Sequence, residues 1–299
     1  MQNKLYKILK IFFRNRRVHR FTEKFIIRIA RFVNVNLLSL AYSEIGILNF
    51  KNAIESGEHY LISTWLKSHL EANGIEKPVF FDVGANIGSY TKLLSDFIPN
   101  SRIYAFEPNT DTFQQLYALS QKNANILAYN TALGSSVGSL ELFIREDNAS
   151  STKATFYHDV LTKIHKYDDV LSSSVPVDTI DHFCSQNHIA RIDLLKIDTE
   201  GHELQVLLGA KKTLESGKIL SIQFEFNEMN IYSRSFLRDF FDILYEFNIY
   251  RLLPRSLLPI NYSSGHEIFL FQNLLAIRKD QDLRTSKSSS IHKLNHQIG

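Results

Sequence analysis

The ten residues Phe81–Asp82–Val83–Gly84–Ala85–Asn86–Ile87–Gly88–Ser89–Tyr90 decide the predicted fold. Residues 79–83 form a short apolar run typical of a buried strand, and residues 89–97 have the apolar spacing of a helix. Gly84 allows a tight turn with a close backbone approach, and Gly88 lets the helix lie against the strand. Because the start of that helix offers unpaired N–H groups, the stretch predicts a strand–turn–helix unit that binds a nucleotide.

Short apolar runs continue to alternate with helical segments after this unit. The further predicted strands lie at residues 102–106, 126–131, 192–197, 219–226 and 268–277, with 139–143 and 250–253 as additional candidates. The further predicted helices lie at residues 110–121, 177–186, 203–215 and 233–247. Such alternation is typical of an α/β fold in which a doubly wound, mostly parallel sheet carries helices on both faces.

The composition divides the 299-residue chain into three parts. We expect a basic, helical N-terminal extension at residues 1–77, a nucleotide-binding α/β domain at residues 78–279, and a disordered polar tail at residues 280–299. Residues 144–176 are rich in Ser, His, Tyr and Asp and break the alternation. We therefore expect a long insertion there that faces the substrate.

Polar residues at the ends of the predicted strands indicate how a nucleoside is held. Asp82 ends the first strand and can accept a hydrogen bond from an ammonium group or a water, whereas Glu107 ends the second, where a carboxylate binds a ribose diol. Asn130 and Thr131 end the third strand and are expected to meet an adenine. The loop lacks the third glycine of dinucleotide-binding loops, so a nucleoside with an amino-acid tail fits better than one with phosphates.

These motifs resemble those of class I S-adenosylmethionine-dependent methyltransferases, specifically the FkbM-type family. The resemblance spans residues 79–277. It is carried by residues 81–88, 106–108, 130–134, 195–203 and 207–210. The motif most specific to the family is Leu195–Lys196–Ile197–Asp198–Thr199–Glu200–Gly201–His202–Glu203. It implies a seven-stranded sheet with an antiparallel last strand, S-adenosylmethionine as the cofactor, and O-methylation of a hydroxyl on a sugar, polyketide, lipid or other small-molecule or glycan acceptor. The cofactor-binding residues it implies are Asp82, Gly84, Asn86, Gly88, Glu107, Asn130, Thr131 and Asp198.

Asp198, Glu200 and His202 are the candidate catalytic residues. Asp198 ends the fourth predicted strand, above the crevice where ligands bind in this topology. An alcohol is a weak nucleophile, so we expect Asp198 near the transfer centre with Glu200 or His202 as a base. The alternative for Asp198 and Glu200 is a helix cap with a first-turn partner. His202 stands where relatives often carry a small residue, which makes it a candidate specificity residue.

Three residues at neighbouring strand ends raise the question of a metal. Asp198, Glu225 and Asn227 could together offer oxygen ligands to Mg²⁺. We nevertheless expect a mechanism without a metal, in which Glu225 and Asn227 bind the acceptor or serve as buried hydrogen-bond partners.

The N-terminal segment carries most of the positive charge. Residues 1–31 hold ten Lys or Arg and one acidic residue, Glu23, which gives net +9, while the rest of the chain holds 24 basic and 30 acidic residues, net −6. Basic and apolar residues recur at helical spacing on opposite sides, although Phe13, Phe21 and Phe25 fall on the basic side. We expect a helical arm packed on the body. The alternatives are peripheral binding of residues 1–33 to an anionic membrane and an organelle transit peptide.

The composition of the chain argues against several other classes of protein. No apolar run reaches the ~20 residues of a membrane span, and charges interrupt every stretch that could serve as a secretory signal. The single cysteine, Cys184, excludes an internal disulfide framework and a Cys-based zinc site, so we expect a cytoplasmic protein, with peripheral membrane contact left open. The acidic body argues against a nucleic-acid partner, and a homo-oligomer is left open.

The sequence offers two alternatives to a methyltransferase. An NAD-dependent short-chain dehydrogenase needs a Tyr-x-x-x-Lys pair in the body, but the match at Tyr6 and Lys10 precedes the nucleotide loop. A non-catalytic cofactor-binding scaffold, attached to a membrane by the basic arm, is the other alternative. The set of Asp82, Gly84, Glu107 and Asp198 argues against it.

Overall fold

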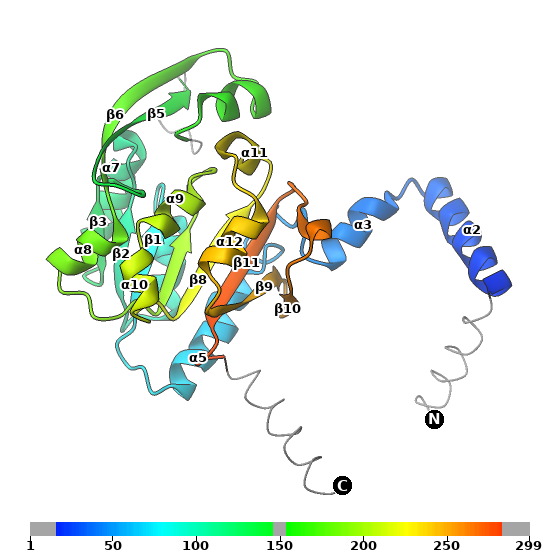
Figure 1. Ribbon diagram of the computed structural model, residues 1–299, viewed down its shortest axis with the longest axis horizontal. Coiled ribbons are helices and arrows are strands. Elements are labelled where there is room, and N and C mark those ends of the chain that lie inside the picture. Colours follow the sequence, from blue (N-terminus) through cyan, green and yellow to red (C-terminus); the bar gives the residue numbers. More distant parts are fainter. Residues whose placement is uncertain (1–15, 146–153, 283–299) are drawn as a thin grey trace, which may run out of the picture.

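The computed structural model of the chain describes residues 16–145 and 154–282, and one large sheet forms its centre (Figure 1). The sheet has eight strands in the order β10-β9-β11-β8-β7-β1-β2-β3. Their bounds are β1 Val79–Val83, β2 Arg102–Phe106, β3 Ile126–Tyr129, β7 Leu194–Ile197, β8 Ser221–Phe226, β9 Phe247–Leu253, β10 Ser256–Ile260 and β11 Gln272–Arg278.

The pairing of these strands confirms the doubly wound, mostly parallel α/β fold. Strand β1 pairs in parallel with β2 and β7, β2 pairs with β3, and β7 pairs with β8. Strand β11 runs antiparallel to both β8 and β9, as the family resemblance implies for the last strand. The sheet has one strand more than the seven expected, because β10 folds back antiparallel on β9 and extends that edge.

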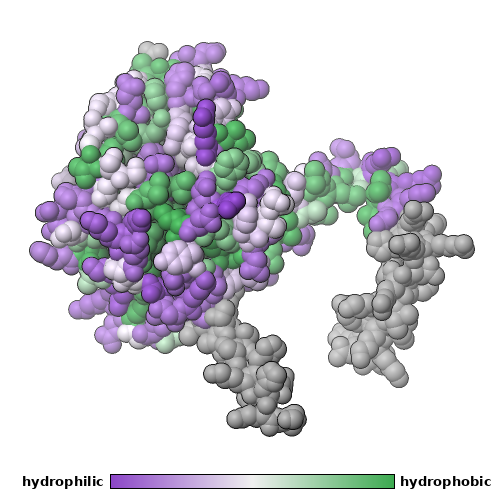
Figure 2. Space-filling model, viewed as in Figure 1, coloured by the Kyte–Doolittle hydropathy of each residue, from purple (hydrophilic) through white to green (hydrophobic). Residues whose placement is uncertain are grey.

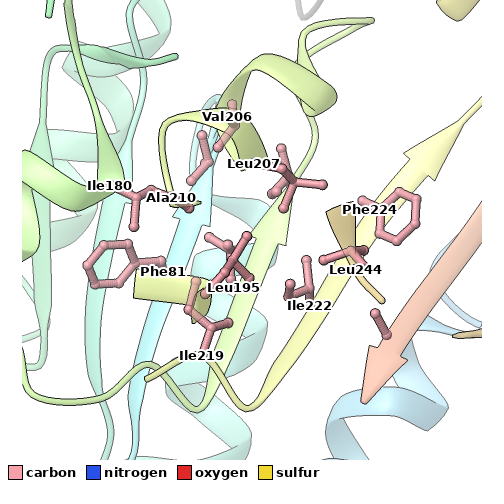
Figure 3. Packing of buried hydrophobic residues seen from close by; sticks show 14 of the residues in the cluster. Phe81, Ile180, Leu195, Val206, Leu207, Ala210, Ile219, Ile222, Phe224 and Leu244 are labelled. Atoms are coloured by element: carbon pink, nitrogen blue, oxygen red, sulfur yellow. The ribbon is translucent and has the colours of Figure 1, made fainter. Parts of the chain in front are cut away.

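Helices cover both faces of this sheet. On one face lie α8 (Ile180–Gln186), α9 (Glu203–Leu208), α10 (Lys211–Glu215) and α12 (Leu237–Ile243). On the other lie α5 (Lys67–Ala72), α6 (Ser89–Phe97), α7 (Thr110–Ser120) and the π-helix η1 (Leu61–Leu66). Figure 3 shows the first of these cores, in which Phe81, Leu195 and Phe224 of the sheet lie among side chains of the covering helices. Each face of the sheet therefore has its own apolar core.

Three predicted helices differ from the observed ones. The helix predicted at 177–186 begins only at Ile180, because its first residues end strand β6. The helix predicted at 203–215 is divided into α9 and α10 at Gly209, which approaches the carbonyl of Gly134 so closely that a side chain would overlap it. The helix predicted at 233–247 is shorter, since α12 follows a separate turn, α11 (Asn230–Ser233), and residue 247 already starts β9.

A small second sheet contains part of the insertion expected at residues 144–176. Its strands β4 (Ala132–Leu133), β6 (Val170–Asp178) and β5 (Gly138–Arg145) lie in the order β4-β6-β5. Strand β5 corresponds to the additional strand predicted at 139–143, and it pairs antiparallel with β6. Figure 1 shows this pair reaching past one end of the main sheet. Residues 146–153 of the insertion lie outside the described part of the chain.

Part of the expected N-terminal extension packs on the main sheet. After the short helices α3 (Leu37–Glu44) and α4 (Glu58–Tyr60), the side chains of η1 enter the second core. Ile47 forms a β-bridge with Gln272, the first residue of β11. The fully buried side chains of η1 are Leu61, Ile62 and Leu66. In space, residues 47–72 therefore belong to the same body as the strands.

Helix α2 (Arg16–Phe32) projects away from this body (Figures 1 and 2). From residue 22 onward its large apolar side chains are open to solvent, with exposed fractions of 54% for Phe25, 46% for Ile29 and 91% for Phe32. The expectation of an arm packed on the body is therefore wrong for the described part of this segment. Residues 1–15 lie outside the described part.

The apolar and basic residues of α2 are not completely separated. Phe25, Ile29 and Phe32 follow the i, i+4, i+7 spacing of one helix face, but Phe25 and Ile27 also line one hollow with Lys24, Arg28 and Arg31. Over residues 16–145 and 154–282, no single helix is long and apolar enough to cross a membrane. One bent pair, Thr22–Phe32 with Leu37–Glu44 at 106°, meets that criterion by combined length and composition alone.

The burial of η1 predicts a large effect of shortening one of its side chains. Ile62→Ala removes most of a fully buried side chain and is expected to lower the free energy of unfolding by about 2–5 kcal/mol. The control, Ile54→Ala, changes a side chain that is 64% exposed and should alter that free energy by less than about 0.5 kcal/mol. Urea unfolding followed by circular dichroism measures both. Equal effects would contradict the packing of η1 on the sheet.

Candidate active site

Two rows of polar residues cross the main sheet near the carboxyl ends of its parallel strands. In the first row Asp82 pairs with Lys196, and Lys196 pairs with Gln223. Two positions further along lie Asp198, just after β7, and Glu225 on β8, which form the second row, and Gly84 has the matching position after β1. Because side chains alternate between the faces of a sheet, both rows point to the face that carries α6 and η1. The intervening residues belong to the opposite, apolar core: Val83, Ile197 and Phe224.

The chain segments that follow β1 and β7 touch at Gly84. Its φ is +80°, and a Cβ at this position would overlap the backbone carbonyl of Asp198. Beside this contact lies a cavity with about 650 Å³ of space, partly open to solvent. The residues predicted from the sequence that line this cavity are Gly84, Asn86, Glu107, Thr131, Asp198 and Glu200.

Glu107 is fixed on the cavity wall by backbone groups on both sides. The residue is 4% exposed, and its two carboxylate oxygens accept N–H bonds of 2.8 Å from Asn86 and Asn109. Asn130 does not line the cavity; its side chain donates to the carbonyls of Glu107 at 2.9 Å and Pro108 at 3.1 Å and so holds the segment after β2. Burial raises the pKa of Glu107 to about 7, and the two N–H bonds oppose part of that rise.

Asp82 lies beneath the cavity, and Lys196 connects it to Asp198. Asp82 is fully buried, accepts a hydrogen bond from Thr91, and has its Oδ1 4.0 Å from Lys196 Nζ. The same Nζ donates to Asp198 Oδ2 at 2.9 Å. Burial lowers the pKa of Lys196, but the carboxylates of Asp198, Asp82 and Glu58 outweigh it and raise that pKa, so the ammonium stays charged. Lys196 is not among the candidate site residues predicted from the sequence, although a lysine inside an apolar strand is a visible signal.

The buried side chain of Glu203 stabilises the loop after β7 through hydrogen bonds. Its Oε1 accepts N–H bonds from Thr199 at 3.0 Å and Gly201 at 3.1 Å. Glu200 has a left-handed backbone with φ 54°, and its carbonyl accepts a bond of 2.9 Å from the hydroxyl of Thr155. Glu203 is 1% exposed and was not identified from the sequence. Its two bonds hold the turn that carries Asp198 and Glu200.

His202 lies behind this loop and does not line the cavity. It is 6% exposed, its ring centroid is 4.7 Å from that of Phe156, and its Nδ1 is 3.4 Å from the Tyr157 hydroxyl. Its Nε2 has no hydrogen-bond partner and faces Gly134, where a Cβ would come within 3.1 Å. Burial lowers the pKa of His202 to about 4, so the imidazole is neutral at pH 7. The structure does not bring His202 together with Asp198 and Glu200.

The other predicted residues are also away from the cavity wall. Gly88, with φ +88°, precedes α6 and lies close to side chains of α7. Glu225 accepts a bond of 3.4 Å from the side chain of Asn227, and burial, followed by the charge of Asp198, raises the pKa of Glu225. Among the residues that the structure describes, no group of three or more His, Cys, Asp or Glu side chains could hold a metal ion.

Comparison with known proteins finds relatives of this region. The methyltransferase FkbM domain matches residues 82–252, more than half of the chain. The hexuronic acid methyltransferase AglP of Haloferax volcanii is 29% identical over 151 residues, which cover 50% of this chain and 56% of AglP. The methyltransferase sdnD of Sordaria araneosa is 31% identical over 161 residues, with 46% and 62% covered. The 2-O-methyltransferase NoeI of Sinorhizobium fredii is 23% identical over 190 residues, with 60% and 76% covered. The matched part of this chain thus spans little more than half the length of AglP and of sdnD.

The contact at Gly84 predicts that a methyl group there is poorly tolerated. Gly84→Ala is expected to destabilise the fold through both its positive φ and its overlap with the Asp198 carbonyl. Gly74→Ala is the matched control, because Gly74 also has a positive φ, +65°, but no atom within 4 Å of the added Cβ. The control should cost about 1–2 kcal/mol, and Gly84→Ala at least about 2 kcal/mol more. Urea titration gives both values, and equal costs would argue against a required close approach.

Proposed function

This chain belongs to the FkbM methyltransferase family, and from that premise we propose that it transfers a methyl group from S-adenosylmethionine to a hydroxyl oxygen. The observation that carries the proposal is Glu107, a buried carboxylate held by two backbone N–H groups on the wall of the cavity beside Gly84. The acceptor we propose is a sugar or another small hydroxylated molecule. The names of AglP, a hexuronic acid methyltransferase, and NoeI, a 2-O-methyltransferase, support this class.

The residues of the cavity fit S-adenosylmethionine. Glu107 accepts one N–H bond on each oxygen, which leaves lone pairs on both for the hydroxyls of a ribose. Gly84 keeps the floor free of a side chain, and Thr131 and Leu133 line the wall with one hydroxyl and one apolar group for an adenine. The predicted residues beneath or beside the wall act indirectly in this proposal, by supporting the loops: Asp82, Gly88 and Asn130.

When bound, S-adenosylmethionine supplies a methyl group already activated on a sulfonium. The chain must orient the acceptor oxygen, exclude water and receive the hydroxyl proton. We propose that Asp198 accepts the hydrogen bond of the hydroxyl and takes its proton, with Glu200 on the same cavity wall as the alternative base. Lys196 orients Asp198 through their 2.9 Å bond. His202, neutral and behind the loop, supports it by packing.

The raised pKa of Glu107 predicts a pH dependence of nucleoside binding. 5′-Methylthioadenosine carries the ribose but no group that titrates near neutral pH, so its affinity reports on the protein. As the pH falls from 8 to 6, Glu107 becomes protonated around its pKa of about 7 and accepts hydrogen bonds less well, so the affinity should fall by up to about tenfold. Isothermal titration calorimetry at several pH values measures this.

The matched variant for this prediction is Glu107→Gln, which cannot titrate. Its affinity should be about tenfold or more below that of the wild-type protein at pH 8 and should not change with pH. An unchanged pH dependence in the variant would assign the titration to another group. Failure of the wild-type protein to bind 5′-methylthioadenosine or S-adenosylmethionine would refute the proposed cofactor.

Asp198→Asn tests the proposed catalytic role. The substitution keeps the shape and removes the charge, so we expect a kcat lowered at least 10²-fold while S-adenosylmethionine binds within a few-fold of wild type. Methyl transfer from labelled cofactor to a panel of sugars and lysate fractions is the assay. Asp96→Asn, which changes a carboxylate whose side chain is 53% exposed, is the control and should leave turnover unchanged. Near wild-type turnover of Asp198→Asn would indicate that Asp198 serves only as a structural helix cap. Cofactor binding without turnover by the wild-type protein would favour the alternative of a non-catalytic, cofactor-binding scaffold.

We further propose that the projecting arm binds an anionic membrane surface peripherally. The supporting observation is the amphipathic helix α2, which projects from the body (Figure 2) and, among the described residues, exposes Phe25, Ile29 and Phe32 as well as a stripe of basic side chains. The basic residues of that stripe with described, exposed side chains are Lys24, Arg28 and Arg31. Apolar insertion and attraction to anionic lipid reinforce each other in such helices.

Neutralising the stripe is expected to weaken membrane binding. The triple variant Lys24→Gln, Arg28→Gln and Arg31→Gln should bind vesicles of phosphatidylcholine with phosphatidylglycerol more than tenfold less tightly than wild type, because each basic residue near such a surface contributes about 1 kcal/mol. The control makes the same charge change on the exposed body residues Lys211, Lys212 and Arg238 and should keep wild-type binding. Vesicle cosedimentation measures both. Equal binding of the two triple variants would contradict the role of the arm.

A further inference from the structure

A groove lies among three helices that cover one face of the main sheet, α9, α10 and α12. It has about 1060 Å³ of space, partly open to solvent. Figure 2 shows apolar surface bordered by hydrophilic residues on this side of the molecule. Leu208 is 43% exposed and Tyr245 61%, so apolar side chains of the groove meet water. The apolar residues that line it are Leu204, Leu208, Leu214, Ile243, Tyr245 and Phe247.

Carboxylates accompany these apolar side chains in the lining of the groove. The acidic lining residues are Glu215, Asp239, Asp242 and Glu246. Lys211 also lines the groove, and Arg238 lies 3.4 Å from Asp242. Four carboxylates against these two cations leave an excess of negative charge, so the groove is complementary to a segment that is both apolar and basic.

The C-terminal part of the chain passes the end of this groove. After β11, the backbone N–H of Lys279 donates to the carbonyl of Glu246 at 3.0 Å. Asp282 is 4% exposed and accepts a bond of 2.8 Å from the side chain of Asn248, which directly follows a lining residue. The tail expected after residue 279 is thus fixed as far as Asp282. Residues 283–299 lie outside the described part of the chain.

The sequence of residues 283–299 matches the groove in charge and in apolar spacing. The segment contains no Asp or Glu, and its net charge of +3 comes from Arg284, Lys287 and Lys293. Three large apolar residues have the i, i+3, i+7 spacing with which a helix presents anchors to an apolar groove: Ile291, Leu294 and Ile298. The eight residues between Asp282 and the first anchor can span up to about 30 Å, so the anchors can reach the groove.

We propose that residues 283–299 dock as an amphipathic helix in the groove of α9, α10 and α12 of the same chain. The three apolar residues of the segment cover the apolar lining, and its basic residues pair with the carboxylates. Because the segment is tethered at Asp282, its effective concentration at the groove is on the order of millimolar. The docked segment covers α9, whose first residue, Glu203, holds the loop after β7. This inference goes beyond the proposed function and does not depend on it.

Two spin labels on the full chain test the docking. One is attached at His296→Cys, on the side of the helix away from its anchors, and the other at Lys212→Cys, an exposed position on α10 outside the groove lining. The single native cysteine, Cys184, takes up no label, because it is buried and burial raises the pKa of its thiol to about 12. Double electron–electron resonance should give one narrow distance distribution, since docking fixes the separation of the labels. A broad distribution would overturn the proposal.

Replacing apolar side chains on either partner should abolish the narrow distribution. The variant of the segment is Ile291→Ser, Leu294→Ser and Ile298→Ser, and its control changes polar residues of the same segment, Thr285→Ala, Ser289→Ala and Gln297→Ala. The variant of the groove is Leu208→Gln with Tyr245→Gln, and its control changes exposed apolar residues outside the groove, Ile54→Gln with Tyr117→Gln. Both controls should keep the narrow distribution. A narrow distribution retained by the groove variant, with an unchanged melting temperature, would place the segment elsewhere and overturn the proposal.

Two further conditions test the tether and the charges. Mixing the labelled protein with an excess of unlabelled protein should leave the distance signal per label unchanged. Loss of that signal would assign the groove to the segment of a second copy and overturn docking within one chain. Raising NaCl from 0.1 to 1 M shortens the Debye length from about 10 to about 3 Å and should lower the docked fraction. An unchanged fraction would overturn the pairing of the basic residues with the carboxylates.

Discussion

The backbone contact between Gly84 and Asp198 is the constraint on which the rest of the site depends. Neighbouring parallel strands end at the same edge of a sheet, and here the segments that follow β1 and β7 meet with no side chain between them. The contact separates two cavities and gives both of them Asp198 as a shared wall. Residues on either side of it, Glu107 and Glu58, therefore line different cavities.

The two faces of the main sheet differ in role: one packs an apolar core that stabilises the fold, and the other carries charged residues of the candidate site. One face of the main sheet carries Phe81, Leu195 and Phe224 in a continuous apolar core (Figure 3). The other carries Asp82 and Lys196, which sit among helices that are otherwise packed by apolar side chains. A buried charge is tolerated only with a partner, so Lys196 and its carboxylates act as a unit. The same unit orients Asp198 toward both cavities.

The sequence predicted the parts of the site that depend on local geometry. Gly84 and Glu107 were identified because a strand–turn–helix unit needs a glycine and because a strand end has a defined position over the sheet. Glu58 and Gln223 could not be predicted this way, since they meet only through tertiary packing of segments 165 residues apart. The turn at Glu200 and Gly201, both with positive φ, directs His202 inward, and spacing alone does not reveal such a turn. For α2, the pattern predicted the helix but not whether it touches the body.

The bridge between Ile47 and Gln272 has a consequence for synthesis on the ribosome. The second core joins residues 61–70 to side chains of β9 and β11, near the opposite end of the chain. Until those last strands emerge from the exit tunnel, the apolar side of η1 has no complete partner, although the helix was made among the first quarter of the residues. Contacts of such long sequence separation form late and slowly. The part of this core that faces β9 and β11 therefore stays open in the nascent chain until these two strands are made.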